Sequence, residues 1–143
     1  VFRGTEAEGY PFLTTPYLGD FVAVAAYRLE QRGTQQLSQE VATKTFAKIR
    51  FIFQAAASLG FDSLVLGALG CGAFNNPPAH IAFLFQRAIE EFGPQFKRVC
   101  FAIFDDRNSP SEGNVATFCA AFGVSPKAVT QQELLLPDSV HQL

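Results

Sequence analysis

"GALGCGAFNNPPAHIAFLF", from Gly67 to Phe85, is the stretch that decides the fold, because it joins a short apolar run to a second one with helical spacing. Its three glycines fall within six residues, and they allow positive φ angles and close approach of the backbone. Asn76 is predicted to cap a helix that has Pro77 at its first position. Free N–H groups of the loop and of the helix start would then face one point. This predicts an anion site, with a plain turn between a strand and a helix as the alternative.

The expected anion site has no basic residue near it in the sequence, because no Lys or Arg occurs between Arg50 and Arg87. We therefore predict a neutral cradle that holds its anion with backbone N–H groups and the helix dipole. A diphosphate diester suits such a cradle. The loop is not a P-loop, since no Gly-Lys-Ser/Thr follows it, and it departs from the GxGxxG pattern at Asn75.

Apolar segments that fit buried strands alternate with segments of helical periodicity along the chain. Strands are predicted at Phe21–Tyr27, Phe61–Leu69 and Arg98–Phe104. Helices are predicted from an N-cap at Ser38 to Leu59, from Pro77 to Phe92, and from Asn114 to Phe122. This alternation is typical of an α/β fold with a largely parallel sheet. Three strands make a narrow sheet, so we expect further strands upstream of this sequence.

Composition restricts the function classes. The chain has 143 residues, a hydrophobic content of 48 % and a net charge of −2, which fit one folded domain and argue against a general nucleic-acid or acidic-membrane surface. No apolar run reaches ~18 residues, so no membrane span is expected. Three cysteines without a CxxC pair favour free thiols in a reducing compartment, cytoplasmic or nuclear. The histidines and cysteines lack metal-ligand spacing, so neither a metal site nor a cofactor is predicted. The start "VFRG" reads like the interior of a longer protein.

The motifs "LVLGALGCGAFNNPP…F" and "FAIFDD…GN…F" resemble the second half of microbial-type poly(ADP-ribose) glycohydrolases, a branch of the macrodomain superfamily. The segments "VFRG…VAVAAYR" and "KIRFIF" resemble the part of the family that precedes this loop. The resemblance covers most of residues 1–123, and residues 124–143 are expected to form a polar C-terminal tail. It implies a macrodomain-like three-layer α/β/α fold with a mostly parallel sheet that lacks its N-terminal strands.

The resemblance also implies an ADP-ribose site. Backbone N–H groups of the loop would bind the diphosphate and Phe74 would pack on the distal ribose, while Phe104 and Asp105 would contact adenine. The implied ligand-binding residues are Gly67, Leu69, Gly70, Cys71, Gly72, Ala73, Phe74, Asn75, Phe104 and Asp105. From the residues alone, Phe74 is equally a core aromatic, and Asp105 is equally a turn or helix-capping residue. Tyr27 is a weak candidate for the cleft wall.

The catalytic signature of the family is missing from this sequence. There is no Asn-Pro-Gly-Gly and no Gln-Glu-Glu, and "QQE" at Gln131–Glu133 has the wrong order and place. No catalytic residue is therefore predicted. The predicted function is the ADP-ribose- or poly(ADP-ribose)-binding portion of a hydrolase that cleaves O-glycosidic ribose bonds when its N-terminal catalytic half is present. The alternative is a non-catalytic reader of ADP-ribose on modified proteins.

A third possibility is a cysteine hydrolase. Cys71 precedes a helix N-terminus, a position that lowers a thiol pKa, and His80 follows nine residues later. No residue that would orient His80 is evident in the sequence. Cys71 is equally a small residue in a tight loop, and His80 is equally a surface residue of the helix.

Overall fold

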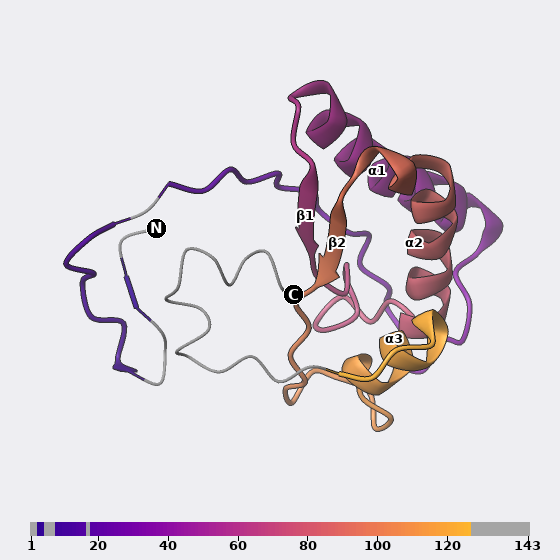
Figure 1. Ribbon diagram of the computed structural model, residues 1–143. Coiled ribbons are helices and arrows are strands. Elements are labelled where there is room, and N and C mark those ends of the chain that lie inside the picture. The colour runs from indigo at the N-terminus through magenta and orange to yellow at the C-terminus, as the bar shows by residue number, and fades with distance from the viewer. Residues whose placement is uncertain (1–2, 5–7, 17, 127–143) are drawn as a thin grey trace.

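The computed structural model describes residues 3–4, 8–16 and 18–126. The predicted tail, residues 124–143, falls almost wholly outside these residues, as does Gln131–Glu133. Three helices and two strands follow one another along the described part of the chain. They are α1 (Gln39–Ser58), β1 (Ser63–Leu66), α2 (Pro78–Phe92), a 3₁₀ turn (Gly93–Gln95), β2 (Arg98–Phe101) and α3 (Asn114–Phe122). Figure 1 shows the two strands side by side, with α1 and α2 next to them.

The sheet consists of β1 and β2, which run parallel with Leu64 opposite Val99 and Leu66 opposite Phe101. Helix α2 connects the two strands, as a parallel pair requires. The structure therefore confirms the α/β class and the parallel sheet. Both strands are shorter than the apolar segments that predicted them.

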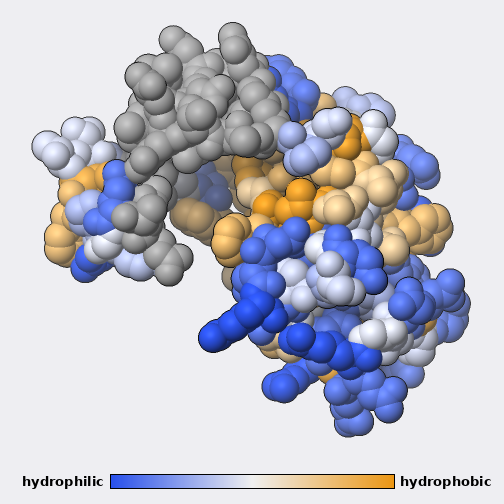
Figure 2. All heavy atoms as spheres, turned by 90° about the horizontal axis from the view of Figure 1, so that it is seen from below, coloured by the Kyte–Doolittle hydropathy of each residue, from blue (hydrophilic) through white to orange (hydrophobic). Residues whose placement is uncertain are grey.

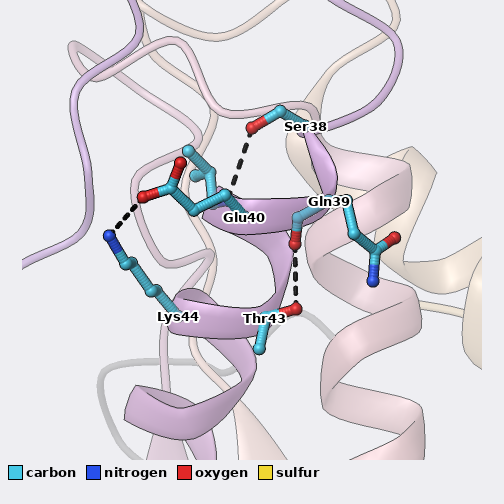
Figure 3. A network of polar contacts seen from close by, with 6 residues as sticks. Ser38, Gln39, Glu40, Thr43 and Lys44 are labelled. Atoms are coloured by element: carbon cyan, nitrogen blue, oxygen red, sulfur yellow. Dashed lines mark hydrogen bonds and ion pairs between the residues drawn. The ribbon is translucent and has the colours of Figure 1, made fainter.

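Helix α1 begins and ends where its local signals predict. At its first turn the Ser38 Oγ accepts the Val41 N–H at 3.3 Å, and the Thr43 hydroxyl donates to the Gln39 carbonyl at 2.9 Å. Lys44 forms an ion pair with Glu40 one turn away, as Figure 3 shows. The helix ends before Gly60, whose φ of +79° only glycine adopts without strain.

The core is centred on α2, which packs against α1 on one side and α3 on the other. Its buried side chains are Ile81, Ala82, Leu84, Phe85, Ala88 and Phe92. Phe85 contacts Phe101 of β2 edge-to-face, with ring centroids 5.2 Å apart. Phe53 of α1 makes a similar contact with Phe96 at 5.7 Å. Contacts between phenylalanine rings thus help to pack the helices against the sheet and its flanking segments.

The predicted strand at Phe21–Tyr27 is wrong, because this segment forms no ladder in the structure. Phe21 is 82 % exposed and Val22 is 46 % exposed. The carbonyl groups of this segment accept hydrogen bonds from side chains instead of from a neighbouring strand. For example, the Lys48 ammonium group donates to the Ala25 carbonyl at 2.7 Å. Apolar and β-branched content makes a segment fit for a strand, but a strand also needs a partner for its backbone groups.

One face of the sheet is not covered by the described helices. Leu64 and Leu66 face the helices, whereas Val65 points the other way and is 75 % exposed. Its register partner on the same face is Cys100. Figure 2 shows apolar surface on the body of the molecule. The helices of the described residues include none that is long and apolar enough to cross a membrane.

Candidate functional site

The glycine-rich loop between β1 and α2 folds into two consecutive tight turns. In the first turn the Cys71 N–H donates to the Ala68 carbonyl at 3.1 Å, and in the second the Asn75 N–H donates to the Gly72 carbonyl at 3.0 Å. Gly70 has a φ of +74°, and a Cβ there would lie 2.5 Å from the Cβ of Ala26. Both its φ and its surroundings therefore require glycine at this position.

The loop is fastened to the segment that precedes α1. The Leu29 N–H donates to the Phe74 carbonyl at 2.9 Å, and the Asn75 side-chain amide donates back to the Leu29 carbonyl at 3.1 Å. Asn75 holds this position with a φ of +58°, which asparagine tolerates better than most residues. The predicted site residue Asn75 thus has a structural role in which its side chain is already engaged.

Asn76 has a role other than the predicted helix cap. Helix α2 begins at Pro78, and Pro77 occupies the N-cap position without a side-chain cap. The Asn76 side chain is buried, and its amide nitrogen lies 2.7 Å from the Tyr27 carbonyl and 3.1 Å from the Gly70 carbonyl. The prediction of an Asn76 cap is therefore wrong, because the amide that would cap α2 instead joins the loop to the segment before α1.

The loop presents a run of backbone donors. Within the described residues, the N–H groups of Gly72, Ala73 and Phe74 have no acceptor in hydrogen-bonding distance. The start of α2 adds fewer donors than a usual helix, because Pro77 and Pro78 carry no N–H. The capacity of the site to bind an anion therefore lies mainly in the loop.

A hollow of about 340 Å³ lies beside this loop and the start of α2. Of the predicted site residues, Cys71, Gly72 and Asn75 line it. The side chain of Asn108, which follows β2, lies close to Gly72, because a Cβ at Gly72 would be 3.8 Å from the Asn108 Cβ. The hollow is thus bounded by the ends of both strands, where ligands collect in parallel sheets.

The hollow has a basic residue that the sequence prediction of a neutral cradle missed. Arg32 lines it, and its Nε donates to the Asn75 Oδ1 at 3.1 Å. Arg32 precedes the stretch from Arg50 to Arg87, which contains no other Lys or Arg. The fold nevertheless places Arg32 next to the loop. Among the described residues, the only other charged residue that lines the hollow is Glu112. The lack of Lys and Arg near the loop therefore holds along the sequence but not in space, because the fold brings Arg32 to the loop.

The predicted adenine-binding residues lie beyond the end of β2 and do not line the hollow. Phe104 is 83 % exposed, so its ring is available for stacking. The Asp105 carboxylate accepts the Asn114 N–H at 2.6 Å and the Val115 N–H at 3.3 Å. Asp105 therefore has the helix-capping role that the residues alone left open, at the first turn of α3.

Phe74, the candidate for the ribose contact, is not part of the core. Its side chain is 38 % exposed, so its ring is not used to fill the interior. Gly67, another predicted residue of the loop, directly precedes the first turn, while Leu69, Gly70 and Ala73 belong to the two turns. None of these four residues lines the hollow. Tyr27 lies beneath the Lys48 ammonium group, which is 3.7 Å from its ring centroid.

The geometry argues against a cysteine nucleophile. Cys71 is buried, and burial raises the pKa of its thiol to about 12, so the thiol stays protonated at neutral pH. The His80 Nδ1 accepts the Leu37 N–H at 2.9 Å instead of serving a thiol. All three cysteines are free. Within the described residues, no group of three His, Cys, Asp or Glu side chains could hold a metal ion.

Known proteins were compared with the chain by sequence and by structure. No protein-family model matches the sequence, and no curated protein matches it. The poly(ADP-ribose) glycohydrolase of Deinococcus radiodurans, solved in complex with ADP-ribose, is 33 % identical with a TM-score of 0.54, over 59 % of this chain and 34 % of that one. The poly(ADP-ribose) glycohydrolase of Thermomonospora curvata is 29 % identical with a TM-score of 0.52, over 63 % and 33 %. These findings confirm the predicted resemblance. The chain spans about a third of the length of these glycohydrolases.

Proposed function

We propose that this chain is the ADP-ribose-binding portion of a poly(ADP-ribose) glycohydrolase-like hydrolase. The observation that carries the proposal is its structural likeness to a bacterial glycohydrolase that was solved with ADP-ribose bound. The loop supports it independently, because the consecutive N–H groups of Gly72, Ala73 and Phe74 form no hydrogen bond within the part of the chain that the structure describes. Such donors suit the phosphate oxygens of a diphosphate.

In this proposal the loop from Gly67 to Asn75 binds the diphosphate, and exposed rings bind the two ends of the ligand. Phe74 packs on the distal ribose and Phe104 flanks adenine, and both rings are exposed in the unbound protein. Asp105 accepts from the adenine amino group while it caps α3. Stacking of a base on an aromatic ring contributes about 1–3 kcal/mol, so Phe104 is a large part of the expected affinity.

Hydrolysis by the whole protein is part of the proposal and needs residues that this chain does not contain. Residues 1–123 then form the C-terminal part of the ADP-ribose-binding domain. The glutamate that serves as the acid in ribose-bond cleavage would come from the part of the domain that the glycohydrolases have and this sequence does not match. The exposed sheet face around Val65 is a surface on which further strands and helices of such a domain could pack.

The reader alternative is favoured by one observation, which is the absence of Gln-Glu-Glu from this sequence. Alone, the chain is expected to bind ADP-ribose without releasing it from poly(ADP-ribose). Its proposed partners are ADP-ribosylated proteins in the cytoplasm or nucleus, and the three free cysteines support a reducing compartment. Release of ADP-ribose from the polymer by this chain would contradict the assignment of catalysis to other residues.

The decisive experiment is isothermal titration calorimetry of the 143-residue chain with ADP-ribose. Gly72→Glu is expected to weaken binding at least tenfold, because its carboxylate would lie among the donors of the phosphate site. Gly72→Ala is the matched control, since a Cβ there would lie 3.8 Å from the Asn108 Cβ, an ordinary van der Waals contact. We expect the control to bind like the wild type. Absence of binding by the wild type, or equal binding by Gly72→Glu, would refute the proposed function.

A further inference from the structure

The residue that the proposed function leaves unexplained is Arg32, which reaches the anion-binding loop from a distant part of the sequence. It is separated from Asn75 by 43 positions, yet its Nε lies 3.1 Å from the Asn75 Oδ1. It also lines the hollow that Cys71 and Gly72 line. The sequence between the two residues contains α1 and β1, so this proximity is a product of the tertiary fold.

Most of the hydrogen-bonding capacity of Arg32 is unused within the protein. A guanidinium has five N–H donors, and the contact with Asn75 uses only the one at Nε. Glu112 also lines the hollow, but no ion pair joins it to Arg32 within the described residues. Among the described residues nothing binds the two terminal nitrogens of Arg32, which are therefore available to a ligand.

The tether at Nε gives the guanidinium a defined place. Asn75 is itself held by its amide, which donates to the Leu29 carbonyl at 3.1 Å. Through Asn75, the planar group of Arg32 is attached to the same turn that presents the free N–H groups of Gly72 and Ala73. A guanidinium with its remaining donors beside backbone donors is well suited to phosphate, which it binds through two parallel hydrogen bonds.

We infer that Arg32 is a phosphate-binding residue of the ADP-ribose site and makes recognition of the diphosphate dependent on charge. This inference rests on the proposed function, because it assumes that the hollow beside the loop receives ADP-ribose. The backbone N–H groups then recognise the shape of the diphosphate, and Arg32 recognises its charge. The site then prefers a doubly charged diphosphate over ligands that carry only adenosine or ribose.

The test is the affinity of the 143-residue chain for ADP-ribose, measured by calorimetry at low and at high NaCl concentration. Arg32→Gln is expected to weaken binding about tenfold at low salt, with a smaller loss at high salt, where the wild-type attraction is already screened. Arg32→Lys is expected to recover only part of the affinity, because it restores the charge but not the two parallel hydrogen bonds. Arg28→Gln is the matched control, because it removes the same charge from an exposed residue of the same segment that does not line the hollow.

The outcomes separate this inference from the proposed function. If Gly72→Glu abolishes binding while Arg32→Gln binds like the wild type, the inference is overturned and the proposed function stands. If Arg32→Gln loses the same factor at both salt concentrations and Arg32→Lys does not recover, Arg32 only positions Asn75 and the inference is again overturned. If the wild type binds no ADP-ribose, both fall. A salt-dependent loss of affinity in Arg32→Gln supports the inference if Arg32→Lys recovers part of it and Arg28→Gln does not reproduce it.

Discussion

The buried amide of Asn76 offers the sharpest test of how the loop is held. Its side chain is 3 % exposed, and its Nδ2 lies 2.7 Å from the Tyr27 carbonyl, 3.1 Å from the Gly70 carbonyl and 3.3 Å from the Phe74 carbonyl. Asn76→Ala removes both side-chain donors, and the Tyr27 carbonyl loses its hydrogen bond, whereas the Gly70 and Phe74 carbonyls still accept the backbone N–H groups of Asn76 and Leu29. With about 1 kcal/mol for the hydrogen bond lost at the Tyr27 carbonyl and about 1–3 kcal/mol for that buried group left unpaired, we expect a loss of about 2–4 kcal/mol.

Asn76→Asp keeps the shape of the side chain but replaces the donor with an acceptor. At neutral pH its carboxylate would face three carbonyl oxygens, so we expect it to destabilise the protein more than Asn76→Ala. This surrounding would raise the folded-state pKa of the carboxyl above its unfolded value of about 3.9. The variant is therefore expected to come closest to the wild type below pH 4 and to lose stability relative to it as the pH rises through the folded-state pKa.

The assays are urea unfolding, which gives the free energy of unfolding, and thermal unfolding, which gives the Tm, both followed by circular dichroism at pH 7 and pH 4. For a chain of this size a loss of about 2–4 kcal/mol lowers the Tm by about 5–15 °C. Gln54→Glu is the control, because it makes the same exchange of amide for carboxylate at an exposed position of α1. The reasoning is refuted if Asn76→Ala costs less than about 0.5 kcal/mol, which is the usual effect of a surface substitution.

Two further predictions concern the same region. Gly70→Ala is expected to lower the free energy of unfolding by about 3 kcal/mol, because it adds a Cβ 2.5 Å from the Ala26 Cβ at a φ of +74°. Gly60→Ala, at a φ of +79° with open space around it, is expected to lower it by about 1 kcal/mol. Equal losses of stability in thermal unfolding would contradict the close contact at Gly70. Burial lowers the pKa of His80 below its ordinary value of 6.5, and its Nδ1 accepts the Leu37 N–H. The unfolded chain therefore binds the proton first, and the free energy of unfolding should fall as the pH drops below about 6.5. Urea unfolding at pH 7.5 and 5.5 measures this fall, which should be smaller in His80→Gln; an equal fall in both proteins would exclude His80 as its source.

The helices are the part of the fold that the sequence predicts well. Their signals are local: Ser38 caps α1, and Gly60 and Gly123 end α1 and α3 with φ angles of +79° and +64°. A capping hydroxyl or a glycine that permits positive φ acts on residues within one helical turn. Its effect can therefore be predicted without knowledge of the rest of the chain.

Strands are predicted less well, for a physical reason. The segment Phe21–Tyr27 is apolar throughout and Phe61–Leu69 is not, but only Phe61–Leu69 contains a strand, β1. A strand exists only where another backbone accepts its hydrogen bonds, and β2 provides that partner for β1. The segment at Phe21–Tyr27 has no such partner within the described residues, so its apolar composition predicted a strand that does not form.

The sequence by itself determined that a glycine-rich turn lies between a strand and a helix, and that its backbone has donors to spare. Only the tertiary structure decided what surrounds that turn. Arg32 reaches Asn75 across 43 positions, and Asn76 reaches Tyr27 across 49. Backbone freedom and helix ends depend on residues a few positions apart, so sequence patterns record them. The charge beside the loop and the anchoring of its asparagines depend on the path of the whole chain, which no short pattern contains.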